Sequence, residues 1–109
     1  MDFSSLKKNE EFKRVYHKGK SFANRQFVLY YYKNGTESSR VGFSISKKYG
    51  KAVERNKLRR RLKEILRLMQ GVREGYDFVW IARSGAKEAD YKELRHSVKH
   101  LFRKTKMMR

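Results

Sequence analysis

The segment YDFVWIA, residues Tyr76–Ala82, is almost continuously apolar and rich in aromatic and β-branched residues. A strand of this kind is typical of a sheet position covered on both faces, because a half-exposed strand alternates apolar with polar side chains. We therefore expect Tyr76–Ala82 to form the central strand of a β-sheet, with other elements packed against both of its faces.

Two segments upstream also have the composition of strands. The first, Phe22–Lys33, is rich in aromatic and β-branched residues, and both of its faces are apolar or aromatic. It is predicted as one strand, with the alternative that Gly19–Ala23 pairs separately. The second, Arg40–Ser46, has one apolar face and one small or polar face, formed respectively by Val41, Phe43 and Ile45 and by Gly42, Ser44 and Ser46. The small face leaves room for another molecule to lie on it.

Three segments have helical periodicity in their apolar residues, and the predicted helices are Asn9–Lys18, Ala52–Gln70 and Asp90–Lys104. Asn9 is the expected N-cap of the first helix, and Gly71 is expected to end the second. Asp90 and Glu93 form a capping-box pattern at the start of the third. The tail Thr105–Arg109 is expected to fray.

The length and the pattern predict one domain, residues 1–109, with the order helix, two or three strands, helix, strand, helix. No apolar stretch approaches the roughly 18–20 residues that a membrane-spanning helix needs, and the N-terminal segment lacks the apolar region of a signal peptide. The chain has no cysteine, which excludes a disulfide framework and a thiolate metal site. We therefore expect a cytoplasmic protein.

The charge of the chain is strongly positive. Lys and Arg number 29 against 11 Asp and Glu, which gives a formal net charge of +18. A free surface with this charge repels itself and weakens the folded state, and a polyanionic partner would relieve the repulsion. Solubility alone needs a net charge of only about 2–8. Nucleic acid is favoured over an anionic membrane as that partner, because no membrane element is evident.

The basic residues are most concentrated in ERNKLRRRLKEILR, residues Glu54–Arg67. At about 100° per residue, an apolar stripe forms from Leu58, Leu62, Ile65, Leu66 and Met69. A second stripe, about 135° away, contains Asn56, Arg59, Arg60, Lys63 and Arg67. Lys57 and Arg61 lie outside this second stripe, and Arg55 lies at the edge of the apolar one. Such a helix can pack on a sheet and still present cations to phosphates, although a solvated charged face is the simpler alternative.

The sequence contains few residues in the spacings typical of catalytic or metal-binding sites. His96 and His100 have the i, i+4 spacing that can bind a metal, but no HExxH glutamate or third ligand accompanies them. Surface histidines on a basic helix are the preferred interpretation. No Gly-rich phosphate-binding loop is present. The sequence therefore predicts neither catalytic nor metal-binding residues in this chain.

The aromatic residues point toward single-stranded nucleic acid. Phe12 and Tyr16 share a helix face, and Tyr30 and Tyr32 share a strand face. Such clusters pack in a core more often than they stack on bases, but a tyrosine ring can stack while its hydroxyl hydrogen-bonds. From the residues alone, both interpretations stay open.

The run KAVERNKLRRRLKE resembles the signature of the bacterial ribonuclease P protein subunit. That family has an Arg-Asn-x-x-(Lys/Arg)-Arg core, here Arg55–Arg60, after a Gly-x-Ala-Val turn, here Gly50–Val53. The resemblance extends through LKKNEEFKRVYHKGKSFANRQFVLY, RVGFSISKKYGKAV, YDFVWIARSGA and LRHSVKHLFRK, and so covers almost the whole chain in order. Lys57 departs from the family, which often has arginine at that position.

The resemblance implies a fold of the α/β class, an α+β sandwich. Such a fold has a central, mostly antiparallel sheet with three helices and a left-handed βαβ crossover, similar to domain 2 of ribosomal protein S5. A left-handed connection between parallel strands is rare.

The resemblance also implies a function. The partners are the ribonuclease P catalytic RNA and precursor tRNA, and the ribonucleoprotein removes the 5′ leader of that tRNA with Mg²⁺ held mainly by the RNA. No membrane and no small-molecule substrate take part, and the protein alone is expected to be non-catalytic.

The resemblance assigns two sets of residues. The RNA-binding helix is expected to use Arg55, Asn56, Arg59, Arg60, Lys63 and Arg67. A leader-binding cleft between the first helix and the sheet is expected to use Phe12, Tyr16, Tyr30, Ser44, Ser46, Lys47 and Lys48. The alternative is a small basic ribosomal or general RNA-binding assembly protein, which explains the charge equally well but not the ordered match along the chain.

Overall fold

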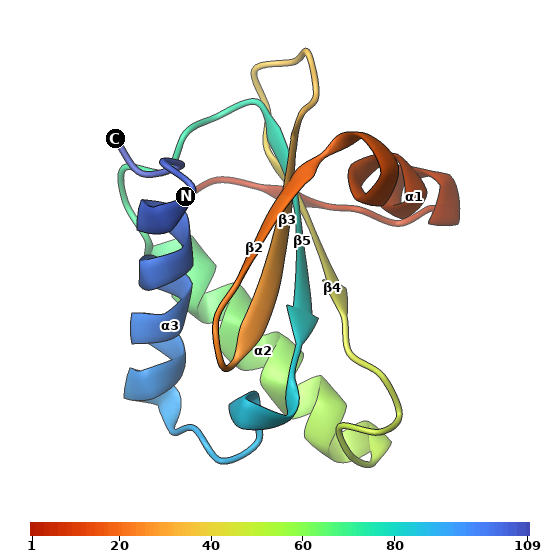
Figure 1. Cartoon of the computed structure of the whole chain (residues 1–109), viewed down its shortest axis with the longest axis vertical. Coiled ribbons are helices and arrows are strands. Elements are labelled where there is room, and N and C mark those ends of the chain that lie inside the picture. Colours follow the sequence, from red (N-terminus) through yellow and green to blue (C-terminus); the bar gives the residue numbers. More distant parts are fainter.

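A five-stranded sheet carries the three α-helices of the protein (Figure 1). The structure is a computed structural model that describes residues 1–109. Its elements are β1 (Ser4–Ser5), α1 (Asn9–Lys18), β2 (Lys20–Ala23), β3 (Phe27–Lys33), β4 (Arg40–Ser44), α2 (Ala52–Leu68), β5 (Tyr76–Ala82), the 3₁₀ turn η1 (Ser84–Ala86) and α3 (Tyr91–Lys104). The predicted α+β class is confirmed. None of the helices has the length and apolar character needed to span a membrane.

Strand β5 lies inside the sheet, as its apolar sequence predicts. The strand order is β1-β4-β5-β3-β2, so β5 is flanked by β4 and β3. It pairs in parallel with β4 and antiparallel with β3, where seven residue pairs form the longest junction of the sheet. The sheet is therefore mixed. The β4–α2–β5 connection joins two neighbouring parallel strands, and followed in Figure 1 it has the left hand that the family resemblance implies.

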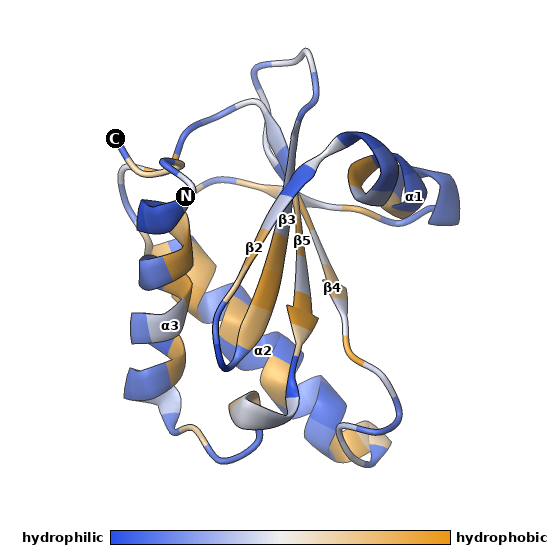
Figure 2. Ribbon diagram, in the orientation of Figure 1, coloured by the Kyte–Doolittle hydropathy of each residue, from blue (hydrophilic) through white to orange (hydrophobic).

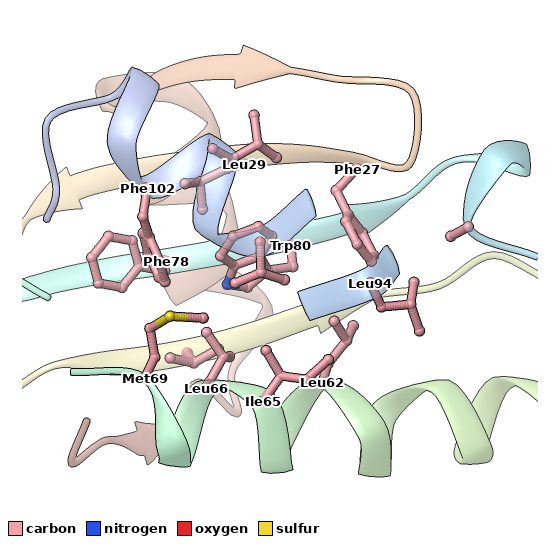
Figure 3. Packing of buried hydrophobic residues seen from close by; sticks show 14 of the residues in the cluster. Phe27, Leu29, Leu62, Ile65, Leu66, Met69, Phe78, Trp80, Leu94 and Phe102 are labelled. Atoms are coloured by element: carbon pink, nitrogen blue, oxygen red, sulfur yellow. The ribbon is translucent and has the colours of Figure 1, made fainter. Parts of the chain in front are cut away.

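The two faces of the sheet are covered unequally. Helices α2 and α3 pack together on one face, and the short helix α1 lies against the other (Figure 1). The main core fills the space under α2 and α3, and Figure 3 labels Phe27, Leu29, Leu62, Ile65, Leu66, Met69, Phe78, Trp80, Leu94 and Phe102 in it. A smaller core under α1 contains Leu6, Val15 and Val79. Only part of the α1 face is therefore sealed from solvent.

Helix α2 follows its predicted stripes. Its apolar residues face the sheet and its charged residues face away (Figure 2), and the buried ones are Leu58, Leu62, Ile65 and Leu66. The helix ends at Leu68 and not at the predicted Gln70, because the backbone becomes extended at Met69. Met69 stays buried in the core, and Gly71 then turns the chain with a φ of +80°. Helix α3 begins as predicted, since the Glu93 N–H donates to Asp90 Oδ1 at 2.8 Å.

The prediction of one continuous strand over Phe22–Lys33 is wrong. The region forms two antiparallel strands, β2 and β3, close to the alternative in which Gly19–Ala23 pairs separately. Asn24 makes the turn between them, because its Oδ1 accepts hydrogen bonds from the N–H groups of Gln26 at 3.0 Å and Phe27 at 2.9 Å. Its Nδ2 donates to Ser97 Oγ at 2.8 Å, which attaches the turn to α3.

Both ends of the chain are more ordered than the sequence predicts. Ser4–Ser5, for which no strand is predicted, pairs in parallel with β4. The expectation of a frayed tail is wrong, because Thr105 and Met107 are buried and the Arg109 N–H donates to the Gly71 carbonyl at 2.7 Å. These contacts join residues far apart in the sequence, so no local pattern could reveal them.

We expect Met107→Ala to lower the free energy of unfolding by about 2–3 kcal/mol, because truncating a buried methionine removes core contacts and leaves a cavity. Urea denaturation followed by circular dichroism measures the loss. Arg109→Ala, at an exposed side chain of the same tail, is the control and should change stability by less than about 0.5 kcal/mol. Equal stability of the two variants would mean that the tail does not pack.

Candidate nucleic-acid interface

The basic stripe of α2 lies on the side of the helix that faces away from the core. Asn56, Arg60, Lys63 and Arg67 are exposed, and Arg59 is half-buried. The Arg59 Nη1 donates to Asn56 Oδ1 at 3.0 Å. This bond occupies the amide oxygen of Asn56, so its NH₂ group is left to donate to phosphate or 2′-hydroxyl oxygens.

Arg55 occupies a different position from the other cations of the stripe. It is half-buried, and its Nη1 donates to the Gly50 carbonyl at 2.7 Å. The bond fixes the turn that leads into α2, and thus the start of the helix relative to the loop that carries Lys47 and Lys48. The guanidinium keeps further N–H donors for a ligand.

The stripe lies toward the β1 edge of the sheet. Lys63 and Arg67 line a shallow hollow of about 330 Å³ together with residues of β1 and of the segment before it. Lys57 and Arg61, which helical phase puts outside the stripe, line a different hollow with residues of η1 and α3. The predicted phase of the helix is therefore confirmed.

Three half-buried aromatic side chains, Phe12, Tyr16 and Tyr30, lie where α1 meets the sheet, and we call the surface that they form with the neighbouring strands the α1 cleft. The ring of Phe12 covers Gly42, where an added Cβ would lie 2.5 Å from two ring carbons. Tyr16 meets Tyr30 edge to face, with ring centroids 5.0 Å apart. Val15 between the two α1 rings is fully buried, whereas Phe12, Tyr16 and Tyr30 are half-buried. Each wall ring therefore has a packed side and a side that a ligand can reach.

The floor of the α1 cleft is a row of small and aliphatic residues across four strands. The register aligns Ser44 with Ile81, Ile81 with Val28, and Val28 with Ala23. Ala23 is exposed and the other three are half-buried, so α1 does not cover this row. Of the four, only Ser44 is predicted from the sequence. The alternation within Phe27–Lys33 was the signal that could have found Val28.

The loop that follows β4 contains the residues predicted to lie at the rim of the α1 cleft. Ser46, Lys47 and Lys48 are exposed there, beyond the end of β4 at Ser44. Tyr49 closes the loop, and its N–H donates to the Ser46 carbonyl at 3.0 Å. Burial raises the pKa of the Tyr49 hydroxyl, with a further rise from the carboxylate of Glu54 and an opposing effect of Arg61. The hydroxyl therefore stays protonated, and the loop keeps its positive charge.

A buried ionic network holds α1 on the sheet, and sequence reasoning missed it. Asp77 of β5 is 1% exposed and accepts hydrogen bonds from Arg40 of β4, at 3.0 Å from Nε and 2.7 Å from Nη2. Asn34 Nδ2 donates to the same carboxylate at 2.9 Å. The Nη1 of Arg40 then donates to the carboxylate of Glu11 on α1. One guanidinium thus joins two strands and a helix.

Glu11 also caps the start of α1. Its Oε1 accepts hydrogen bonds from the N–H groups of Lys7 and Lys8, each at 2.9 Å. The prediction that Asn9 is the N-cap is therefore wrong. The N-cap is Lys8, and the Lys8 side chain makes no cap hydrogen bond. The backbone N–H groups of Lys8 and Lys7 hold the pKa of Glu11 below its usual value, and Arg40 lowers it further. The hydrogen bond with Asp77 raises the pKa of Arg40. Glu11 and Arg40 therefore stay charged and paired with each other.

The geometry defines a basic α+β protein whose open, aromatic cleft lies on one face of the sheet and whose cationic helix lies on the other. The cleft contains hydroxyls, and the carboxylates of Glu11 and Asp77 on this face of the sheet are engaged by Arg40. Nowhere in the chain do three or more His, Cys, Asp or Glu side chains converge to hold a metal ion. His96 and His100 remain a pair on the surface of α3.

Comparisons with known proteins agree with this class. The model of the Ribonuclease P family matches residues 2–106. The ribonuclease P protein component of Clostridioides difficile is 47% identical over 110 residues, which cover 96% of both chains. The structure of the Staphylococcus aureus RNase P protein has a TM-score of 0.89 at 37% identity, covering 96% of this chain and 97% of that one. A mutant of that protein described as defective in mRNA degradation activity has the same TM-score at 38% identity, covering 95% and 89%.

The chain belongs to the ribonuclease P protein family. The members are protein subunits of the endoribonuclease ribonuclease P, a tRNA-processing enzyme, and this chain has that subunit role. The match spans nearly the whole chain, which favours this family over the ribosomal alternative.

We expect the contribution of Glu11 to stability to be present near neutral pH and to be lost in acid. Its folded-state pKa lies below the ordinary value of 4.5, so the contribution is complete above that value and disappears as pH falls through the folded pKa. Glu11→Gln should therefore lower the unfolding midpoint at pH 7, and the difference from the original protein should shrink below about pH 4.

Glu10→Gln is the matched control, because Glu10 is exposed in the same helical turn. Thermal unfolding of the three proteins between pH 3 and 7 measures the effect. A difference for Glu11→Gln that does not change with pH would show that the charge of Glu11 does not hold α1.

Proposed function

We propose that the protein binds two RNAs within ribonuclease P. The basic stripe of α2 binds the catalytic RNA, and the α1 cleft binds the 5′ leader of precursor tRNA, which assists removal of the leader. The observation that carries this proposal is the α1 cleft itself, whose aromatic walls are half-buried while its floor is left uncovered. A cleft of this kind suits an extended strand better than a compact ligand.

The α2 stripe supports the RNA half of the proposal. Its predicted members are Arg55, Asn56, Arg59, Arg60, Lys63 and Arg67. Arginine can bind a phosphate with two parallel hydrogen bonds, which lysine cannot do. The bond between Arg59 and Asn56 sets the direction of both side chains before RNA arrives, so less conformational entropy is lost on binding.

The α1 cleft supports the leader half of the proposal. Phe12, Tyr16 and Tyr30 offer ring faces and edges to bases, and Ser44 offers a hydroxyl on the floor. Lys47 and Lys48 at the rim, with Ser46, face the backbone phosphates of a strand lying in the cleft. Stacking and phosphate contacts depend little on base identity. This combination fits a leader whose sequence varies from one precursor to the next.

The proposal places the chemistry of cleavage outside the protein. Mg²⁺ in the holoenzyme would activate the attacking water and stabilise the leaving oxygen, and the proposal assigns those ions mainly to the RNA. The carboxylates of Glu11 and Asp77 are engaged by Arg40. The protein's own part is to hold the leader and the catalytic RNA in one arrangement.

We expect the purified protein alone to leave precursor tRNA uncut, and to support cleavage when combined with a ribonuclease P RNA at low Mg²⁺, where the RNA alone is inactive. Gel analysis of 5′-labelled precursor tRNA measures this. An mRNA substrate is included, because a related protein is described by an mRNA degradation activity. Metal-dependent cleavage of precursor tRNA by RNA-free protein would overturn the assignment of chemistry to the RNA.

We expect Arg59→Ala and Arg60→Ala each to weaken binding of the catalytic RNA by roughly threefold to fivefold near 0.15 M salt, the contribution of one phosphate contact. Arg61→Ala should change affinity by less than twofold, because its side chain faces the hollow beside α3. Filter binding measures affinity, and unfolding midpoints confirm that all three variants fold. Equal losses from all three substitutions would mean that the stripe is misassigned.

We expect Phe12→Ala and Tyr16→Ala to weaken holoenzyme binding of precursor tRNA by about 1–3 kcal/mol per lost base stack, and only when a leader is present. Val15→Ala is the control from the same helix face, because Val15 is fully buried and its truncation should lower stability without leader dependence. Affinities for precursor tRNAs with leaders of several lengths and for mature tRNA measure the effect. An equal loss of affinity for mature tRNA would mean that both rings act through the structure of the protein and do not contact the leader.

A further inference from the structure

A second basic stripe runs along α3, outside the surfaces assigned above. Lys92, His96, Lys99 and Arg103 recur at helical spacing, and all four are exposed. They lie opposite the buried side of the helix, which carries Leu94, Ser97, Val98, Leu101 and Phe102. By the rise of about 1.5 Å per residue, the stripe is roughly 16 Å long, which matches several nucleotides of a backbone.

The cations of this stripe lack acidic partners. None of the three salt bridges in the protein involves α3. The acidic residues at its start, Asp90 and Glu93, form the capping box and accept hydrogen bonds from each other's backbone N–H groups. Lys99 and Arg103, four residues apart on this face, repel each other and slightly destabilise the helix. The stripe therefore has an uncompensated charge that an external polyanion fits.

The β2–β3 turn extends the stripe into a shallow trough of about 550 Å³, lined by Asn24, Arg25, Gln26, Lys92, Glu93, His96, Ser97 and His100. The trough is held in place by Asn24. Its Nδ2 donates to Ser97 Oγ at 2.8 Å, and its carbonyl accepts a hydrogen bond from Arg83 Nη1 at 2.8 Å. Arg25 thus adds a further exposed cation from a turn with a defined position.

An exposed aromatic ring lies on the same side of the sheet. Phe22 is 44% exposed, although most large apolar residues of the protein are buried. It pairs across β2 and β3 with Leu29, whose side chain is in the core under α3. Phe22 therefore projects from the edge strand on the α3 side. An exposed ring on the side of the sheet that also carries a basic stripe is suited to binding unpaired nucleotides.

The position of the α3 stripe in the fold favours the catalytic RNA over the 5′ leader as its partner. Strands β1 and β2 are the opposite edges of the sheet. The α2 stripe lies toward β1, whereas α3 contacts β2 and β3. The α1 cleft, where the leader is proposed to bind, is on the other face. A segment on the α3 stripe is therefore different from the leader, and it lies on the helical face that is proposed to meet the catalytic RNA.

We infer that the α3 stripe, with Arg25 and Phe22, is a second binding surface for the catalytic RNA, which takes a separate segment of its phosphodiester backbone containing unpaired nucleotides. The inference rests on the proposed function. It makes the protein a bridge between two segments of one RNA, held at opposite edges of the sheet.

The test compares Lys92→Gln/Lys99→Gln with the control Lys18→Gln/Lys33→Gln, which removes the same charge by the same substitution at exposed lysines outside the proposed surfaces. The affinity of each protein for a ribonuclease P RNA is measured across a salt series without precursor tRNA. Loss of two phosphate contacts should weaken binding roughly tenfold near 0.15 M salt and reduce the log–log salt slope by about 1.4. The control should change affinity by less than twofold, and Phe22→Ala should weaken binding with an unchanged unfolding midpoint.

The arms of the experiment separate this inference from the proposed function. If the original protein does not bind the RNA, or if Arg59→Ala/Arg60→Ala binds it normally, the proposed function fails and the inference with it. If those proteins behave as expected but Lys92→Gln/Lys99→Gln matches its control, only the inference is overturned. A second measurement determines the affinity of each holoenzyme for leader-bearing precursor tRNA. A loss by this variant in that measurement alone would also overturn the inference, because the stripe would then contact the substrate.

Discussion

The arrangement of this protein depends on the buried carboxylate of Asp77. An ionised group inside a sheet is stable only when it is paired and fully hydrogen-bonded, and Arg40 and Asn34 supply those bonds. Arg40 also binds Glu11, so the residue that neutralises the core is the one that holds α1. Removing one partner of such a buried pair costs about 3–5 kcal/mol. The position of α1, and with it the α1 cleft, is therefore tied to the stability of the sheet.

The shape of the α1 cleft follows from this attachment at one end of the sheet. Val15 seals the contact, and Phe12 packs on Gly42, where a larger residue would collide with the ring. Beyond Tyr16 and Tyr30 the helix stops, and the floor row that ends at Ala23 is left uncovered. A short helix on a five-stranded sheet thus leaves an open aromatic surface beside it without any cavity in the core.

The charge distribution explains why the molecule needs a partner. Of its 29 Lys and Arg residues, Arg40 neutralises the buried carboxylate, and Lys87 makes one further ion pair, at 3.9 Å. Most of the remaining cations are exposed and include two helical stripes and the loop at the rim of the cleft. Within each stripe the cations lie close together along one helix, so an extended polyanion relieves their mutual repulsion. A subunit role in a ribonucleoprotein agrees with this distribution.

Much of the fold was determined by the sequence itself. The apolar run at Tyr76–Ala82 requires a doubly covered strand, and the phase of α2 separates core residues from Arg59 and its neighbours, because these properties depend on periodicity within one element. The tertiary structure alone decided the contacts between elements: the hairpin at Asn24, strand β1, the packed tail, and the pairing of Arg40 with Asp77 and Glu11. Each of these joins residues that are far apart in the chain or replaces one plausible local structure by another. Burial determines their energy, and burial is a property of the whole fold.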